Sequence, residues 1–97
     1  MPTYISLGNW TDQGVRNVKD ATKRLDAAKQ MMKDAGGELK AFYMTMGAYD
    51  LVTIAEAPND EVVAKILLTI GGLGNVRTTT LRAFTETETR KIIASLG

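Results

Sequence analysis

Three residues in the middle of the chain have side chains and spacing suited to chemistry. Gly47, Tyr49 and Asp50 lie between two apolar segments. Asp50 could act as a general base with Tyr49 as its hydrogen-bonding partner, provided that a covered sheet raises the pKa of the carboxyl. The alternative is a hairpin turn, in which Gly47 takes a positive φ and Asp50 binds local backbone amides. Turn chemistry explains these residue types more directly, but both interpretations stay open.

A second set of candidates would bind a ligand and not react with it. Trp10, the only tryptophan, follows Asn9, and the two could line a pocket for a flat organic molecule together with Tyr43. The favoured alternative is that Trp10 packs over the hairpin or seals the edge of a dimer, because lone tryptophans are more often packing elements. Arg82 could hold a carboxylate or phosphate, although an ion pair with Glu56 or a helix acid is the favoured alternative for it and for Arg77. The ligand-binding candidates are Asn9, Trp10, Tyr43, Gly47 and Arg82.

The composition excludes several classes of site. Among 97 residues there is no histidine and no cysteine, which removes the commonest general base and the usual ligands of zinc, iron–sulfur clusters and haem. We therefore expect no metal and no cofactor. The formal net charge is +1, which gives no electrostatic reason to expect nucleic acid or an anionic membrane as a partner. No signal peptide or membrane span is recognisable, so the expected location is the cytoplasm.

These candidates depend on strands and helices that the apolar spacing predicts. Alternation predicts strands, and spacings of three and four predict helices. The predicted strands are 4–10, 38–46, 49–57 and 76–84, with a tight turn at 47–48. A helix is predicted from Thr11 or Asp12 to about Ala35, with Val15, Val18, Leu25, Ala28, Met32 and Ala35 on its buried stripe. Within it, Asp20 precedes Arg24 by four residues, which favours an ion pair.

Two further helices complete the pattern. Pro58 to Glu61 opens a second helix with a cap residue and acids in its first turn, and Gly71-Gly72 ends it. Thr85 and Glu88 form a capping box at the start of a short terminal helix. The order β-α-β-β-α-β predicts an α+β fold of ferredoxin-like topology. It has a four-stranded antiparallel sheet with both main helices on one face, within a single domain of residues 1–97.

The sheet is predicted to be apolar on both faces. Leu39, Ala41 and Tyr43 alternate with Phe42, Met44 and Met46, and Tyr49, Leu51 and Ala55 alternate with Val52 and Ile54. A face without helices needs another cover, because exposed apolar patches usually mark interfaces. We expect two copies to pack face to face in a dimer or larger assembly. The alternative is that the terminal helix, with only three large apolar residues, folds over the open face.

Several segments together resemble the GYD family of small bacterial and archaeal proteins. They are Leu7–Gly14, Gly47–Asp50, Glu56–Glu61, Gly74–Thr78 and Thr80–Thr85. The resemblance covers nearly the whole chain, with Ala48 separating the glycine from the Tyr-Asp pair. It implies a bacterial-type protein of unknown function, similar in architecture to the dimeric α+β barrel group. That wider group includes ligand-sensing domains and cofactor-independent oxygenases, so the fold alone does not decide the function.

Three functions remain open at this point. The leading hypothesis is a small-molecule-binding or regulatory oligomer, with a pocket near Trp10, Tyr43, Tyr49 and Asp50. The second is a cofactor-independent oxygenase or isomerase that uses Asp50 as its base, so enzymatic activity is undecided. The third is an assembly module that binds a protein partner.

Overall fold

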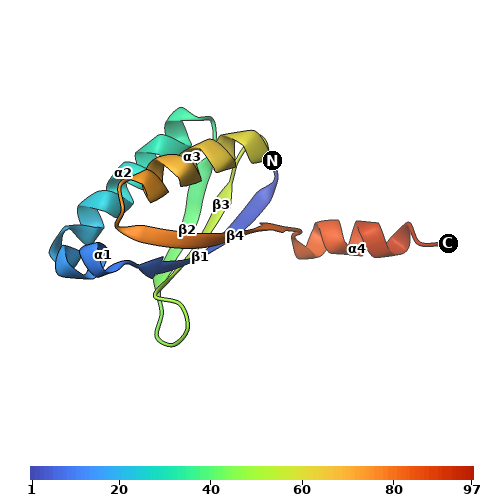
Figure 1. The fold of residues 1–97 in the computed structure, drawn as a ribbon. Helices are drawn as coiled ribbons and strands as arrows, with labels where there is room; N and C mark the ends of the chain where they lie inside the picture. Colours follow the sequence, from blue (N-terminus) through green and yellow to red (C-terminus); the bar gives the residue numbers. More distant parts are fainter.

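The computed structural model describes residues 1–97, which form four strands, four α-helices and one 3-10 helix (Figure 1). The predicted order of elements is confirmed, except that the first helix is divided into three pieces. In chain order the elements are β1 (Thr3–Trp10), α1 (Asp12–Arg16), the 3-10 helix η1 (Val18–Asp20), α2 (Ala21–Asp34), β2 (Glu38–Met44), β3 (Leu51–Glu56), α3 (Asp60–Gly72), β4 (Val76–Ala83) and α4 (Glu86–Ala94).

All four strands pair in one antiparallel sheet, in the order β2-β3-β1-β4. Helices α2 and α3 lie over one face, which we call the helix face, and the opposite face is the open face (Figure 1). Each crossover helix returns the chain past a neighbouring strand, which produces this order from two β-α-β units. The predicted ferredoxin-like α+β fold is therefore confirmed.

The helix predicted from Thr11 or Asp12 to Ala35 is interrupted at Asn17. Thr11 caps α1, since its side chain accepts the N–H of Gly14 at 3.1 Å. Asn17 then leaves helical geometry, with φ −104° and ψ 25°, and ends α1. Val15 and Val18 were expected on the buried stripe, but they are 55% and 41% exposed. Glycine, valine and asparagine are weak helix formers, so this stretch gains little from continuing as a helix.

The predicted ion pair between Asp20 and Arg24 is wrong. The Arg24 guanidinium turns back to the end of α1, where it donates to the carbonyl oxygens of Asn17 at 2.9 Å and Gly14 at 3.5 Å. Carbonyls at a helix C-terminus lack intrahelical partners and attract such donors. Asp20 pairs instead with Lys23, whose Nζ lies 3.9 Å from Asp20 Oδ1. The break in the helix thus changes the partners that helical spacing had suggested.

The hairpin between β2 and β3 is wider than predicted. The strands end at Met44 and begin again at Leu51, so loop 45–50 replaces a tight turn at 47–48. The pairing also shifts register at Lys40, between Leu39 and Ala41. This bulge moves Leu39 to the helix face, opposite Ala55, and breaks the alternation that had grouped it with Ala41 and Tyr43.

A small apolar core joins the helices to the sheet. Only 7 of the 97 residues are buried. Five of these are hydrophobic and form one cluster, to which α2 and α3 contribute one residue each: Tyr4, Met32, Ala55, Ala57 and Val63. The Tyr4 hydroxyl also donates to the Asp60 carboxylate. This hydrogen bond fixes β1 to the first turn of α3, which Asn59 caps as predicted by accepting the N–H of Val62 at 3.0 Å.

We expect Tyr4→Phe to cost about 1 kcal/mol of stability at neutral pH, because Asp60 is exposed and water can replace the lost hydroxyl. Burial, assisted by the Asp60 carboxylate, raises the pKa of Tyr4 above its ordinary value. The folded protein therefore keeps a proton that the unfolded chain loses near pH 10. The stabilisation that comes from this raised pKa is fully present below about pH 10, the ordinary pKa of tyrosine, and it is lost as the pH rises through the pKa of Tyr4 in the folded protein.

Urea unfolding followed by circular dichroism, at several pH values from neutral to about 11, tests this linkage. The free energy of unfolding should fall more steeply above about pH 10 in the wild type than in Tyr4→Phe. If the free energy of unfolding falls equally steeply with pH in the two proteins, Tyr4 contributes nothing to the loss of stability at alkaline pH.

The terminal helix α4 begins with the predicted capping box. Thr85 Oγ1 accepts the N–H of Glu88 at 3.1 Å, and Glu88 accepts the N–H of Thr85 at 2.9 Å. The hydrogen bond from the Thr85 backbone lowers the pKa of Glu88. The helix extends away from the sheet and the other helices (Figure 1), and its large apolar side chains are exposed. In the single chain, therefore, α4 does not fold over the open face.

Candidate functional site

The central candidates, Gly47, Tyr49 and Asp50, lie in loop 45–50, which extends beyond the sheet (Figure 1). Gly47 has φ 113°, in the left-handed region that favours glycine. Thr45 closes the loop, because its hydroxyl donates to the Tyr49 carbonyl at 2.6 Å and its N–H donates to the Asp50 carbonyl at 2.8 Å. The loop is therefore held at its base by backbone groups of the candidate residues.

Asp50 joins this loop to β1. Its N–H donates to the Gly8 carbonyl at 2.9 Å, and its carboxylate accepts the N–H of Trp10 at 3.1 Å. The carboxylate thus extends the β1–β3 ladder beyond its last backbone pair, Gly8 with Leu51. No hydrogen bond joins the Tyr49 hydroxyl to Asp50. A catalytic role for these two residues stays a prediction, whereas the backbone contact gives Asp50 a structural role.

We expect Asp50→Ala to cost about 1–2 kcal/mol, because it leaves the partly buried N–H of Trp10 without its acceptor. Asp50→Asn keeps an oxygen at the same place and should lose less than half as much. Urea unfolding followed by the fluorescence of Trp10 measures both variants. Equal losses would mean that the negative charge, and not the hydrogen bond, is what the fold requires.

The other candidate residues lie in separate places. Asn9 and Tyr43 lie on the open face, whereas Trp10 lies on the helix face and lines a cavity beneath α2. Arg82 pairs with Tyr4 near the opposite end of β1. The structure therefore does not bring the predicted ligand-binding set together in one pocket. Of the residues expected around that pocket, it brings together only Trp10 and Asp50, through a backbone contact.

Arg82 contacts two aromatic rings in place of the predicted ion pair. Its guanidinium carbon lies 4.7 Å from the centroid of the Phe84 ring and 5.8 Å from that of Tyr4. Such cation–π contacts contribute about 0.5–1 kcal/mol at exposed sites. Glu56 was one of the predicted partners of Arg82, but its Oε1 lies 3.9 Å from Lys40 Nζ instead. Arg82 therefore links the ring of Phe84, just after β4, to the ring of Tyr4 on β1.

The open face carries an extensive apolar surface. The strand register places an apolar side chain of every strand on it. These side chains are Ile5, Leu7, Ala41, Tyr43, Val52, Ile54 and Leu81. Tyr43 and Leu81, at the margins, are 59% and 48% exposed, and the five between them are only partly buried. Sequence alternation predicted this apolar character, and no element of the chain covers it.

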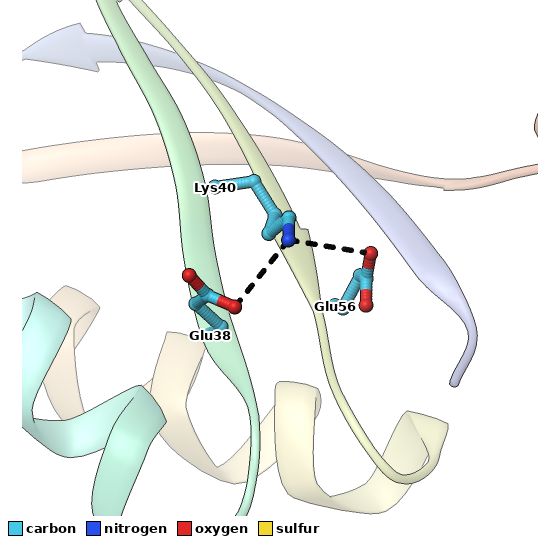
Figure 2. A network of polar contacts seen from close by, with 3 residues as sticks. All are labelled: Glu38, Lys40 and Glu56. Atoms are coloured by element: carbon cyan, nitrogen blue, oxygen red, sulfur yellow. Dashed lines mark hydrogen bonds and ion pairs between the residues drawn. The ribbon is translucent and has the colours of Figure 1, made fainter.

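The two ends of the open face differ in charge. Glu38 and Glu56 are cross-strand neighbours, and such a like-charge pair is destabilising without a compensating cation. Lys40 supplies one, with its Nζ 3.4 Å from Glu38 and 3.9 Å from Glu56 (Figure 2). Two carboxylates and one ammonium leave this end negative. At the other end Arg77, which pairs with Asn9, has no acidic side chain within ion-pair distance.

The structure contains neither of two common kinds of functional feature. No three or more acidic side chains gather closely enough to hold a metal ion. None of the helices combines the length and apolar composition that crossing a bilayer requires. The surfaces that remain to explain are the open face, the exposed α4 and the cavity beside Trp10.

A comparison with family models decides the relationship that the motifs suggested. The model described as the GYD domain matches residues 4–93. The chain belongs to the GYD domain family. The resemblance inferred from the segments around Gly47–Asp50 is therefore confirmed.

A relative and a solved structure, both from Thermus thermophilus, are similar to this GYD domain. The relative is named glutamine synthetase and cystathionine beta-lyase binding protein; it is 34% identical over 84 residues, which cover 86% of this chain and 88% of the relative. The solved structure is the crystal structure of TTHA0845, which matches with a TM-score of 0.55 at 24% identity, over 88% of this chain and 95% of that chain. The structural likeness supports the fold alone.

Proposed function

We propose that this GYD domain is a protein-binding module that assembles as a homodimer and attaches to a metabolic enzyme. The observation that carries the proposal is the relative named for binding glutamine synthetase and cystathionine beta-lyase. The alignment covers most of both chains, so the shared fold makes up most of the relative that binds. Residues 1–97 would act as one domain.

The open face is the surface that we assign to the second copy. It is broad, it carries apolar side chains from all four strands, and nothing in the chain covers it. A two-fold axis brings the same patch of two copies together, so a continuous apolar face is self-complementary. Face-to-face packing of two sheets would bury Tyr43 and Leu81 together with the inner residues.

Charge favours one arrangement of the two copies. A two-fold axis parallel to the strands would place the negative Glu38–Lys40–Glu56 end of one copy over the same end of the other. That negative end lies on β2 and β3, whereas Arg77 lies on β4, at the other edge and the other end of the sheet, so the two are diagonally opposite. An axis in the plane between the sheets and diagonal to the strands would place the negative corner of one copy over Arg77 of the other. Opposite charges would then meet at two corners, and we therefore propose this diagonal arrangement, in which the strands of the two sheets cross at a large angle.

We assign the enzyme-binding role to α4. This helix extends away from the body (Figure 1) and leaves Ile92 and Ile93 47% and 60% exposed. Leu96, just beyond its C-cap Ser95, is 72% exposed. An exposed helix that ends in such a group of apolar side chains can anchor in an apolar groove of a partner. Pairing of the open faces would leave such an arm free to contact a different protein.

The test uses the full chain together with glutamine synthetase or cystathionine beta-lyase, each purified from the organism that produces this chain. Surface plasmon resonance should show saturable binding of at least one enzyme by the wild type. Ile93→Asp should weaken that binding at least about tenfold, since it places a charge in the apolar contact. Thr87→Asp is the matched control, because it adds the same charge to a polar, exposed position on α4.

Sedimentation of both variants should show the same oligomeric state as the wild type. If neither enzyme binds, the proposed partner class is wrong. If both variants bind as well as the wild type, α4 is not the surface that the enzyme contacts.

A further inference from the structure

We infer that the cavity between α2 and the helix face is a binding site for a small, planar, uncharged aromatic molecule that carries one hydrogen-bonding group. The cavity has a volume of about 180 Å³, and its lining includes Trp10 at the end of β1 and Ile70 in the last turn of α3. It lies on the opposite side of the sheet from the open face, so this inference does not depend on the proposed protein-binding function.

The cavity exists because the middle of the helix face lacks large side chains. The strand register aligns the small residues Ser6, Gly8, Thr53, Thr78 and Thr80 on this face. Thr53 and Thr78 line the cavity, and the others adjoin them in the sheet. Ser6 and Thr80 use their hydroxyls on each other, at 2.8 Å. Helices packed over such small residues leave space that the side chains do not fill. Apolar cavities of about 150 Å³ already hold a benzene-sized molecule.

The walls of the cavity favour an aromatic occupant. Ten of its 14 lining residues are hydrophobic. Trp10 and Phe42 supply two aromatic rings, and Met31 supplies a thioether. Aromatic rings pack favourably in offset or edge-to-face contact with other rings, and methionine sulfur packs well against ring edges. A planar ring therefore gains contacts here that a branched aliphatic molecule of similar size would not.

The polar groups of the cavity define the rest of the ligand. Thr53 and Thr78 line it, and their hydroxyls make no hydrogen bond within the chain. Arg24 also lines it, but its guanidinium already donates to the carbonyl oxygens of Gly14 and Asn17. The surface that the cavity presents is almost entirely apolar, so a single hydroxyl or amine on the ligand would have to lie at its margin, where exposed Thr78 is the available hydroxyl and no counter-ion is needed. Specific small-molecule sites combine apolar walls with a few placed polar groups in this way.

The probe for this site is 4-fluorophenol, titrated into the wild-type protein and followed by fluorine NMR and by the fluorescence of Trp10. Because Trp10 is the only tryptophan and lines the cavity, its emission should change with the same saturation curve as the fluorine signal. We expect saturation with a dissociation constant on the order of 1 mM or below. A linear, unsaturable response in both signals would overturn the inference.

Two variants locate the bound probe. Thr53→Leu fills the middle of the cavity and should weaken binding at least about tenfold. Thr22→Leu adds the same side chain to an exposed position of α2 that does not line the cavity, and it should bind like the wild type. If Thr53→Leu does not fold, Ala27→Leu replaces it, because Ala27 is an exposed helix position that lines the cavity. Unchanged binding in the cavity variants, or equal loss in Thr22→Leu, would place the probe elsewhere and refute the site.

Discussion

Gly14→Ala should lower the free energy of unfolding by about 3 kcal/mol or more. An alanine Cβ at this position would lie 2.0 Å from the carbonyl oxygen of Asn75, far inside van der Waals contact. That oxygen belongs to the backbone and already accepts the N–H of Thr11 at 3.0 Å, while Thr11 Oγ1 donates to the Gly74 carbonyl at 2.5 Å. The clash can be relieved only by separating α1 from the start of β4, and overpacking of this severity is strongly destabilising.

Thermal unfolding followed by circular dichroism measures this effect, and the midpoint should fall by more than about 10 °C. Gly71→Ala is the matched control. A Cβ at Gly71, in α3, meets no atom within 4 Å, so alanine should stabilise the helix by about 0.5–1 kcal/mol. A Gly14→Ala protein that melts with the wild type would mean that α1 does not pack on Asn75.

Val52→Lys should weaken the proposed homodimer at least about 100-fold. Val52 lies on the open face between Leu7 and Tyr43, near the centre of the surface that we assign to the second copy. The two-fold axis would bury one lysine from each copy in an apolar contact, and a buried charge without a partner costs several kcal/mol. The single chain should still fold, because this side of β3 is only partly covered in it.

Sedimentation equilibrium over a range of protein concentrations gives the dissociation constants. Ala64→Lys is the control, since Ala64 is exposed on α3, away from the open face, and it should leave the dimer unchanged. A wild-type protein that sediments as a monomer would refute the homodimer. A dimer that tolerates Val52→Lys would have to use another surface.

The elements with a regular side-chain period could be predicted from the sequence. Strand alternation and helix spacing report burial on one face, and the order of strands and helices then allows few topologies. The capping box at Thr85 is equally readable, because its two hydrogen bonds join residues three apart. The irregularities could not be predicted in this way. The break at Asn17 follows from weak helix formers, which the apolar spacing does not report. The bulge at Lys40 changes the pairing between two strands, which the period of one strand does not contain.

The candidate site shows the same limit. The sequence points to Asp50 because a carboxylate near a glycine can do chemistry, but its partner is the backbone of Trp10, 40 residues away in the chain. The cavity beside Trp10 depends on small residues from three strands that meet only through the sheet register. Single-sequence patterns give no measure of such an empty space, although the run of threonines in β4 is the visible part of the signal.

The isolation of α4 also has a consequence for the protease sensitivity of the chain. A nine-residue helix that extends away from the sheet is marginal in water (Figure 1), so its order rests mainly on its capping box and the Arg90–Glu86 pair at 2.9 Å. Arg90 and Lys91 are cleavage points for trypsin-like proteases and lie within this helix. If α4 is the enzyme-binding arm that we propose, the unbound helix frays and can be cut there, whereas the bound helix is protected. Cutting after Arg90 or Lys91 would remove Ile92 and Ile93 from unbound copies, so these copies would lose the proposed contact surface while the sheet stays intact.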